Sequence, residues 1–300
     1  MANSLIQEIN TEIKPYIADD PRIVFNYLSP ENYEGPHRSW IYRGQRDSNW
    51  SLLPALFRED CINKWPEFKG RRKFNYQEFC QAEYNLLRRF VKLADSVGLK
   101  IPTDSFSFRT MQNPDFNCFP LVQNMDIWAI AQHHGIPTRL LDFTHNGLYA
   151  AYFAAYWCIK EKDNNGNLSV WGINVKEYCD IMKDTDRRIQ LASVPTFDNN
   201  YLYVQKAVFL YELRLHEKWK NELHTDEMDF SIEKAMYDEL KAKGVDPNKI
   251  IKRLVFPKHK AEQLIHSLHL NDIHLAYLKP NYDSIKESME LEDKIGFKRM

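Results

Sequence analysis

The sequence predicts an α+β protein with a mixed central sheet flanked by helices, and three observations lead to that prediction. Between Tyr76 and Gly98 the apolar residues fall three or four positions apart, which is the period of an amphipathic helix. Short runs of apolar and β-branched residues, such as 168–175 and 249–256, are typical of strands. These two kinds of segment follow one another irregularly, so a mixed sheet is expected in place of a doubly wound parallel one.

The expected elements follow from periodicity and from turn residues. Residues 1–30 form an N-terminal segment, helical from about residue 4, and 31–300 form one α+β domain, because no repeat or low-complexity linker marks another boundary. Up to residue 145 we expect a strand over 39–44, a helix over 76–98, a loop over 100–120, a helix ending before Gly135 and a strand over 139–143. Beyond it we expect helices over 146–160, 231–243 and 258–268, and strands over 168–175, 206–213, 249–256 and 274–278.

Composition narrows the class of protein. The chain has 300 residues, 44% of them hydrophobic, which is enough for a sizeable core. Its 40 basic and 41 acidic residues predict no strong bulk attraction to nucleic acid or to an anionic membrane. Five widely spaced cysteines without a Cys-x-x-Cys motif argue against a disulfide framework and a structural zinc site. With no apolar run of about 20 residues, we expect a cytoplasmic protein without a membrane span.

Two stretches concentrate polar residues beside apolar ones. In the first, Tyr42-Arg43-Gly44, a guanidinium follows an apolar strand and a glycine would let the backbone approach a ligand closely. The second runs from Asp126 to His145; Gly135 and Pro137 end its helix, and Thr144 or His145 is placed to cap the next one. Both stretches are candidate parts of one site.

These motifs resemble the FRG domain family, which is named for a (Phe/Tyr)-Arg-Gly motif. The resemblance rests on 42–44 and on Gln132-His-His-Gly-Ile-Pro-Thr-Arg-Leu-Leu-Asp-Phe-Thr144, and it extends through 83–99 and 203–209 to 278–283. FRG domains are often encoded by bacteria and phages, and their Arg-Gly strand is similar to the first motif of the Arg-Ser-Glu class of ADP-ribosyltransferases. The resemblance implies an ADP-ribosyltransferase-like fold and an NAD-dependent transferase or NAD-cleaving enzyme, such as a toxin or phage-defence effector. NAD would be the substrate and a protein or nucleic acid the acceptor.

The same resemblance implies roles for particular residues. Arg43 would hold the diphosphate or ribose, Thr144 would orient the site, and Gln205 or Glu212 would steady the ribose hydroxyls. The chain departs from those enzymes in one respect, because their Gln/Glu-x-Glu turn is replaced by Gln205-Lys206-Ala207, which has no acid. The nearest carboxylate on that strand is Glu212.

The two arginines also invite a reading from physical chemistry alone. Arg43 and Arg139 lie in apolar strands, where a guanidinium needs an anion or several carbonyls to offset its desolvation. For Arg139 two alternatives stand, a structural pair with Asp142 or direct contact with a ligand. Arg43 has no carboxylate neighbour before Asp47, which favours an external phosphate or carboxylate. The ligand is therefore expected to be a nucleotide or another small anion.

The remaining candidates are histidines and aromatic residues. His134, and with less support His133, is placed to act as a general base. Neither this adjacent pair nor His266-x-x-His269 forms a metal-binding motif. We expect His266 and His269 on an amphipathic surface. No metal is predicted. Tyr42, Trp50 or Phe143 can stack on a base or pack in the core. The predicted cofactor-binding set is Tyr42, Arg43, Gly44, Arg139, Asp142 and Phe143.

Two other functions fit the same residues. A non-catalytic nucleotide or anion sensor would use the arginines for binding, and the missing acid supports it. In an interaction module, Arg43 and Arg139 would only brace the fold.

Overall fold

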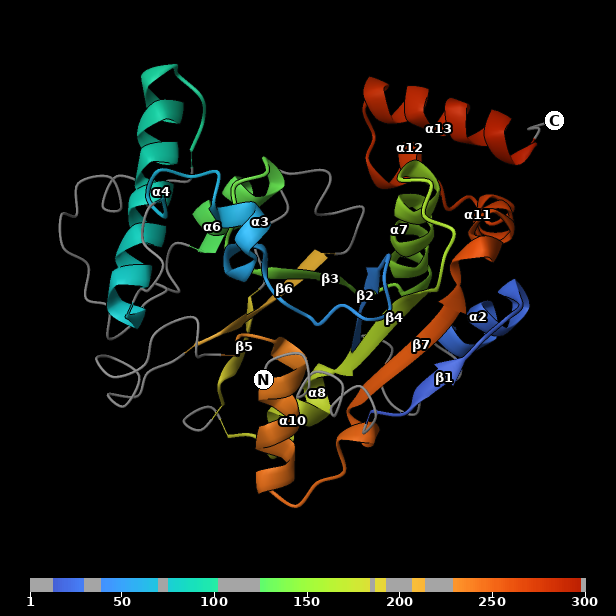
Figure 1. Ribbon diagram of the computed structural model, residues 1–300, viewed down its shortest axis with the longest axis horizontal. Coiled ribbons are helices and arrows are strands. Elements are labelled where there is room, and N and C mark those ends of the chain that lie inside the picture. The colour runs from blue at the N-terminus through green and yellow to red at the C-terminus, as the bar shows by residue number, and fades with distance from the viewer. Residues whose placement is uncertain are drawn as a thin grey trace.

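The computed structural model describes residues 13–29, 39–69, 75–101, 125–183, 187–192, 207–213 and 229–297. In this part of the chain seven strands form one sheet in the order β1-β7-β4-β2-β3-β6-β5, with helices on both faces (Figure 1). The β1–β7 pair is parallel and the others are antiparallel. The predicted α+β class with a mixed sheet is confirmed.

Most predicted strands are present with ends shifted by one or two residues. The strands are β1 (Pro15–Ile17), β2 (Trp40–Gln45), β3 (Leu141–Thr144), β4 (Asn167–Asn174), β5 (Ile189–Ala192), β6 (Ala207–Glu212) and β7 (Ile251–Pro257). The helical prediction for 4–30 is wrong at β1, an edge strand, where proline is tolerated. Residues 1–12 lie outside the described part, and the division of the chain at residue 30 stays a prediction.

The predicted helices over 76–98, 146–160, 231–243 and 258–268 and the one that ends before Gly135 are present, whereas helices over 59–62, 175–181 and 282–295 were not predicted. The helices are α2 (Pro21–Leu28), α3 (Glu59–Ile62), α4 (Tyr76–Ser96), α6 (Met125–His133), α7 (Gly147–Lys160), α8 (Val175–Ile181), α10 (Ile232–Ala242), α11 (Ala261–His269), α12 (Leu275–Leu278) and α13 (Tyr282–Ile295), with 3-10 turns at Ala55–Phe57, Pro247–Lys249 and Lys258–Lys260. The strand predicted over 274–278 is instead the single turn α12, which the His274 side chain caps at the Tyr277 amide. Asn146, and neither Thr144 nor His145, caps α7. Of the predicted loop over 100–120, all but its first two residues lie outside the described part.

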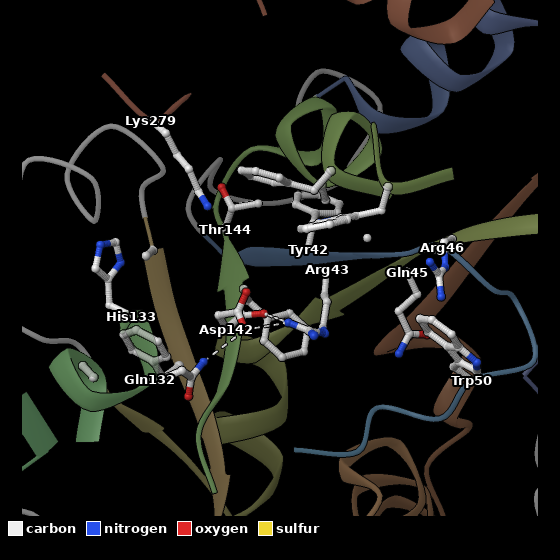
Figure 2. Close-up of a pocket in the computed structure, with 18 of the residues that line it drawn as sticks. Tyr42, Arg43, Gln45, Arg46, Trp50, Gln132, His133, Asp142, Thr144 and Lys279 are labelled. Carbon is white, nitrogen blue, oxygen red and sulfur yellow. Dashed lines mark hydrogen bonds and ion pairs between the residues drawn. The ribbon is translucent and has the colours of Figure 1, made fainter. Parts of the chain in front are cut away.

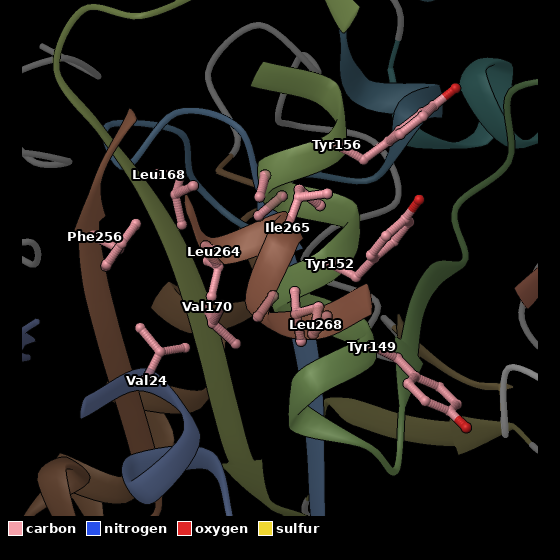
Figure 3. Packing of buried hydrophobic residues seen from close by; sticks show 14 of the residues in the cluster. Val24, Tyr149, Tyr152, Tyr156, Leu168, Val170, Phe256, Leu264, Ile265 and Leu268 are labelled. Carbon is pink, nitrogen blue, oxygen red and sulfur yellow. The ribbon is translucent and has the colours of Figure 1, made fainter. Parts of the chain in front are cut away.

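Helix α7 covers the middle of one sheet face. Residues of α7 and α11 form one buried cluster with Leu168, Val170 and Phe256 of β4 and β7, and Figure 3 shows the tyrosines of α7 on the side of the helix that faces away from these strands. On the same face, α4 and α6 pack on Phe209 of β6. Helices α8 and α10 cover the opposite face, where Trp171 is part of the core. The sheet is therefore buried on both sides, and two helical groups share one face.

Strands β2 and β3 separate between those two helical groups. Within the described residues they share one registered pair, Tyr42↔Thr144, although β2 continues along β4 to Gln45 and β3 continues along β6 to Leu141. An antiparallel ladder that stops so early leaves backbone groups that need other partners. The opening between β2 and β3 is the feature that positions the candidate site.

Gly44 is required by the packing of α7 on β2. A Cβ atom at this position would lie 1.9 Å from the carbonyl oxygen of Ala150 and 3.1 Å from the Cβ of Ala154. The close neighbour of this glycine is therefore helix α7, and the expected approach of a ligand to its backbone stays a prediction.

Candidate functional site

A pocket of about 570 Å³ lies over the opening between β2 and β3. Its walls come from β2, β3, the start of β6, α6, α7 and the loop after β2, and Lys279 reaches it from the segment after α12. Figure 2 shows Arg43 and Asp142 in the middle, His133 and Lys279 towards one end, and Arg46 and Trp50 towards the other. A cavity of this size is typical of small-molecule and cofactor sites.

Arg43 bridges the separated strands. By strand alternation it belongs with Ile41, whose side chain is in the core on the α10 side, but the opening lets its guanidinium reach Asp142. Arg43 Nη1 donates to the Asp142 carbonyl oxygen at 2.8 Å and lies 2.8 Å from Asp142 Oδ1. The guanidinium thus supplies a bond that the backbone ladder no longer makes. The sequence offers Arg43 no carboxylate before Asp47, and its partner Asp142 lies 99 residues along the chain. The expected contact of Arg43 with an external anion stays a prediction.

Asp142 is held from its other side by Gln132 of α6, which Thr138 in the loop before β3 orients. Gln132 Nε2 donates to Asp142 Oδ1 at 3.2 Å, and Thr138 Oγ1 donates to Gln132 Oε1 at 2.6 Å. Desolvation opposes ionisation of Asp142, but the charge and hydrogen bond of Arg43 and the charge of Arg58 hold its pKa below the ordinary value. The pocket floor therefore carries an oriented carboxylate that is ionised at neutral pH.

Arg139 is a structural residue and contributes nothing to the pocket lining. It is 1% exposed, pairs with the buried Glu83 of α4, and donates from Nη1 to Tyr76 Oη at 3.0 Å. Trp128 Nε1 donates to the same Glu83 at 2.8 Å. Both sequence alternatives for Arg139, a pair with Asp142 or contact with a ligand, are corrected: the partner comes from a distant helix, which fixes α4 and α6 to the loop before β3.

The pocket carries an excess of positive charge. Among its described lining residues, Arg43, Arg46, Arg58 and Lys279 face two carboxylates, Asp142 and Glu161. Arg58 donates from Nε to the Leu53 carbonyl at 2.9 Å, and neither Arg58 nor Lys279 forms an ion pair within the described residues. On a chain whose net charge is −1, this local excess favours an anionic ligand.

Of the two candidate histidines, His133 lies at the pocket and His134 does not. Both side chains are exposed, but only His133 is part of the pocket lining. Burial and the charges of His134 and Lys279 lower the pKa of His133. It is therefore neutral near pH 7 and able to accept a proton. Adjacent residues on a helix end point in different directions, so only one of them enters the site.

The acid expected on β6 is not in the pocket. Glu212 lies on the face of β6 shared with Val208 and Leu210, and Arg188 Nε donates to its Oε1 at 3.0 Å. Gln205 lies outside the described residues. Ala207 is paired with Thr144, and both line the pocket. At the position where the family resemblance implies a glutamate, the wall of the pocket is thus an alanine methyl group.

The aromatic candidates divide by burial. Tyr42 and Phe143 are at most 4% exposed and serve mainly as core, although both also line the pocket. Trp50 lies at the pocket with 45% of its surface exposed. Sequence reasoning missed Trp157, which is 43% exposed at the same pocket, and the helical spacing of Ala150, Phe153, Trp157 and Glu161 was the signal that could have found it.

The other sequence expectations concern metals and membranes. His269 is buried at 4% exposure, so the expected surface position of His266-x-x-His269 is wrong for its second histidine. Cys61, Cys80, Cys158 and Cys179 are free thiols. In the described part of the chain no three His, Cys, Asp or Glu side chains form a group that suits a metal ion. None of the helices there combines the length and the apolar character needed to cross a bilayer.

Comparison with known families identifies the segment that carries the site. Residues 38–164 match the family model described as the FRG domain. The chain therefore carries an FRG domain. The match contains β2, α4, α6, β3 and α7, and with them Arg43, Asp142 and Trp157, but it ends before the 203–209 and 278–283 segments to which the sequence resemblance was extended. No curated protein and no solved structure matches the chain.

The FRG segment does not supply the whole pocket. Ala207, Phe209 and Lys279 line it from beyond residue 164. Lys279 comes after a helical turn where the sequence pattern predicts a strand, and no local pattern marks it as a site residue.

Proposed function

We propose that this FRG-domain protein binds NAD between β2 and β3, cleaves its nicotinamide–ribose bond and transfers the ADP-ribosyl group. The observation that carries the proposal is the Arg43–Asp142 pair at the centre of a pocket with excess positive charge. The pair combines the two groups that such a reaction needs, a cation that binds a diphosphate and a fixed negative charge near the ribose.

Arg43 retains binding capacity after it has paired with Asp142. Its two contacts come from Nη1 alone, and 17% of its side chain stays exposed in the pocket. A guanidinium has five N–H donors, so Nη2 remains for a phosphate oxygen. Arg58 and Lys279 supply two further cations to the same pocket, which suits the negative charge of a diphosphate.

The proposed reaction breaks the bond between C1′ of the ribose and the nicotinamide nitrogen. The electron pair leaves with nicotinamide, and the positive charge that develops on the ribose is stabilised by the carboxylate of Asp142. An oxygen of water or of an acceptor then bonds to C1′, and its proton passes to neutral His133. Thr144 at the end of β3 would orient the ribose.

The test is nicotinamide release and label transfer from NAD carrying a labelled adenylate, with a panel of protein and nucleic-acid acceptors. Arg43→Ala and Asp142→Asn should abolish release. Arg22→Ala is the matched control, because Arg22 also pairs with a carboxylate at 2.8 Å but lies on α2, away from the pocket. Release without label transfer would make the protein an NAD hydrolase. Neither release nor binding of NAD by the wild type would refute the proposal.

A nucleotide sensor without catalysis is the second candidate, and Ala207 is the observation that favours it. Ala207→Glu places a carboxylate beside Thr144, where the family resemblance implies the catalytic acid. If the wild type binds NAD without cleaving it and Ala207→Glu gains release, the site is a binding site of transferase-like geometry. If the wild type already releases nicotinamide, the hypothesis of a non-catalytic sensor is wrong.

A further inference from the structure

Two tryptophans at the pocket leave a large part of their apolar surface in water, which is energetically unfavourable. Trp50 and Trp157 leave 45% and 43% of their surface in contact with solvent, and they come from the loop after β2 and from α7. Large aromatic surfaces left open at a concave site are typical of ligand contacts.

Both rings are braced by cations. The Arg46 guanidinium carbon lies 5.1 Å from the centre of the Trp50 ring, and Lys160 Nζ lies 5.1 Å from the centre of the Trp157 ring. Lys160 is held in turn by Glu287 at 2.9 Å and is not part of the pocket lining. The brace on Trp157 therefore stands outside the pocket and leaves ring surface available inside it.

One carboxylate accompanies these rings. Glu161 follows Trp157 by one helical turn, lines the same pocket and keeps half of its side chain exposed. Its contact with Arg46 Nη1 is long, at 3.7 Å, whereas Asp142 is held at 2.8 Å by Arg43. A carboxylate accepts hydrogen bonds and offers none when it is ionised. It therefore suits an amino group and disfavours a carbonyl or carboxylate.

We infer that Trp50, Phe153 and Trp157 form a seat for an aromatic base that bears an amino group, and that Glu161 accepts a hydrogen bond from that group. This inference rests on the proposed function and adds the chemistry that selects the base. The adenine amino group and the carboxamide of nicotinamide share this chemistry. A hypoxanthine ring or a nicotinic acid ring presents oxygen to Glu161 and is rejected.

The experiment measures dissociation constants by calorimetry on the full chain for three dinucleotides: NAD, nicotinamide hypoxanthine dinucleotide and nicotinic acid adenine dinucleotide. Wild type should bind one of the two analogues about tenfold more weakly than NAD, and the analogue that loses affinity identifies the seated ring. Glu161→Gln should remove that discrimination, because an amide can donate to the oxygen that replaced the amino group. Glu290→Gln is the control, since Glu290 also stands 3.7 Å from a basic side chain but on α13.

A second set of variants tests the aromatic seat. Trp157→Ala should weaken NAD binding about tenfold or more while Trp157→Phe retains most of it, because stacking depends on a ring. Tyr282→Ala, an exposed aromatic residue on α13, should change nothing.

Each result decides one of the two proposals. If NAD binds but neither analogue differs from it, and Trp157→Ala binds as wild type does, the seat is refuted and the proposed function stands. If no dinucleotide binds, the proposed function fails. The aromatic seat is then tested by comparing the dissociation constants of AMP and IMP, and those of nicotinamide mononucleotide and nicotinic acid mononucleotide. A tenfold preference for the amino-bearing member supports it, and equal or absent binding overturns it.

Discussion

Replacing Gly44 with alanine should destabilise the protein by forcing α7 away from β2. The added Cβ would lie 1.9 Å from the Ala150 carbonyl oxygen and 2.8 Å from its carbon, both backbone atoms that no rotamer change can move. Relief requires a shift of about 1 Å between helix and strand in a close-packed interior. Overpacking of this kind costs about 3 kcal/mol at the upper end of its usual range, and the loss of glycine's flexibility returns less than about 1 kcal/mol.

The assay is urea unfolding, which should give a free energy of unfolding about 2–3 kcal/mol below that of wild type. Gly172→Ala on β4 is the control, because its Cβ would meet Tyr42 ring atoms no closer than 3.3 Å, and it should cost less than about 1 kcal/mol. A Gly44→Ala variant as stable as Gly172→Ala would refute the view that this glycine serves helix packing. Since α7 also carries Trp157 and Glu161, ligand affinity should fall together with stability.

Three further predictions test the supports of the site and its proton acceptor. Arg139→Met should lower the free energy of unfolding by about 3–5 kcal/mol, because it leaves the buried Glu83 charge unpaired, and Glu83→Gln should restore part of the loss in the double variant; equal stability of single and double variants would contradict the pairing. Burial raises the pKa of Glu233 to about 7, so the folded state holds its proton more tightly than the unfolded chain, and stability should fall as pH rises from about 4.5 to 7. Glu233→Gln should remove that part of the pH dependence, seen by urea unfolding across the window, and an unchanged pH profile would show that Glu233 does not titrate there. His133→Gln should reduce nicotinamide release by about a hundredfold or more while His134→Gln changes it little, provided that the proposed transfer reaction is observed; the reverse order would restore the sequence-based choice of His134.

Local patterns in the sequence were enough to predict most elements, because helix periodicity and turn residues are local signals. The helix α4 has its expected apolar stripe, but Leu93 and Val97 near its end are 65% exposed, whereas Ala94 in the same turn is buried. The short strands β1 and β5 were missed, because three or four residues carry too little pattern to predict a strand.

The site residues show the same limit more sharply. The two arginines were correctly expected to need partners, but Arg139 was offered its sequence neighbour Asp142 or a ligand, and Arg43 an external anion. Asp142 belongs to Arg43 and Glu83 belongs to Arg139, and sequence separations of 99 and 56 residues hide both pairs. Tertiary contacts therefore distinguish an arginine that can bind a ligand from one that stabilises the fold, and Arg139 is of the second kind.

The segment that defines the family is shorter than the unit that can fold. Residues 38–164 end just before β4, the strand that pairs with every residue of β2 from Trp40 to Gln45. A polypeptide trimmed to that segment would leave the β4 edge of β2 without its partner strand and would lose Ala207 and Lys279 from the pocket. The matched segment thus contains most of the residues that line the pocket, and the sheet around them is completed by the chain beyond residue 164. A truncated form of this chain should therefore include β4, β6 and β7.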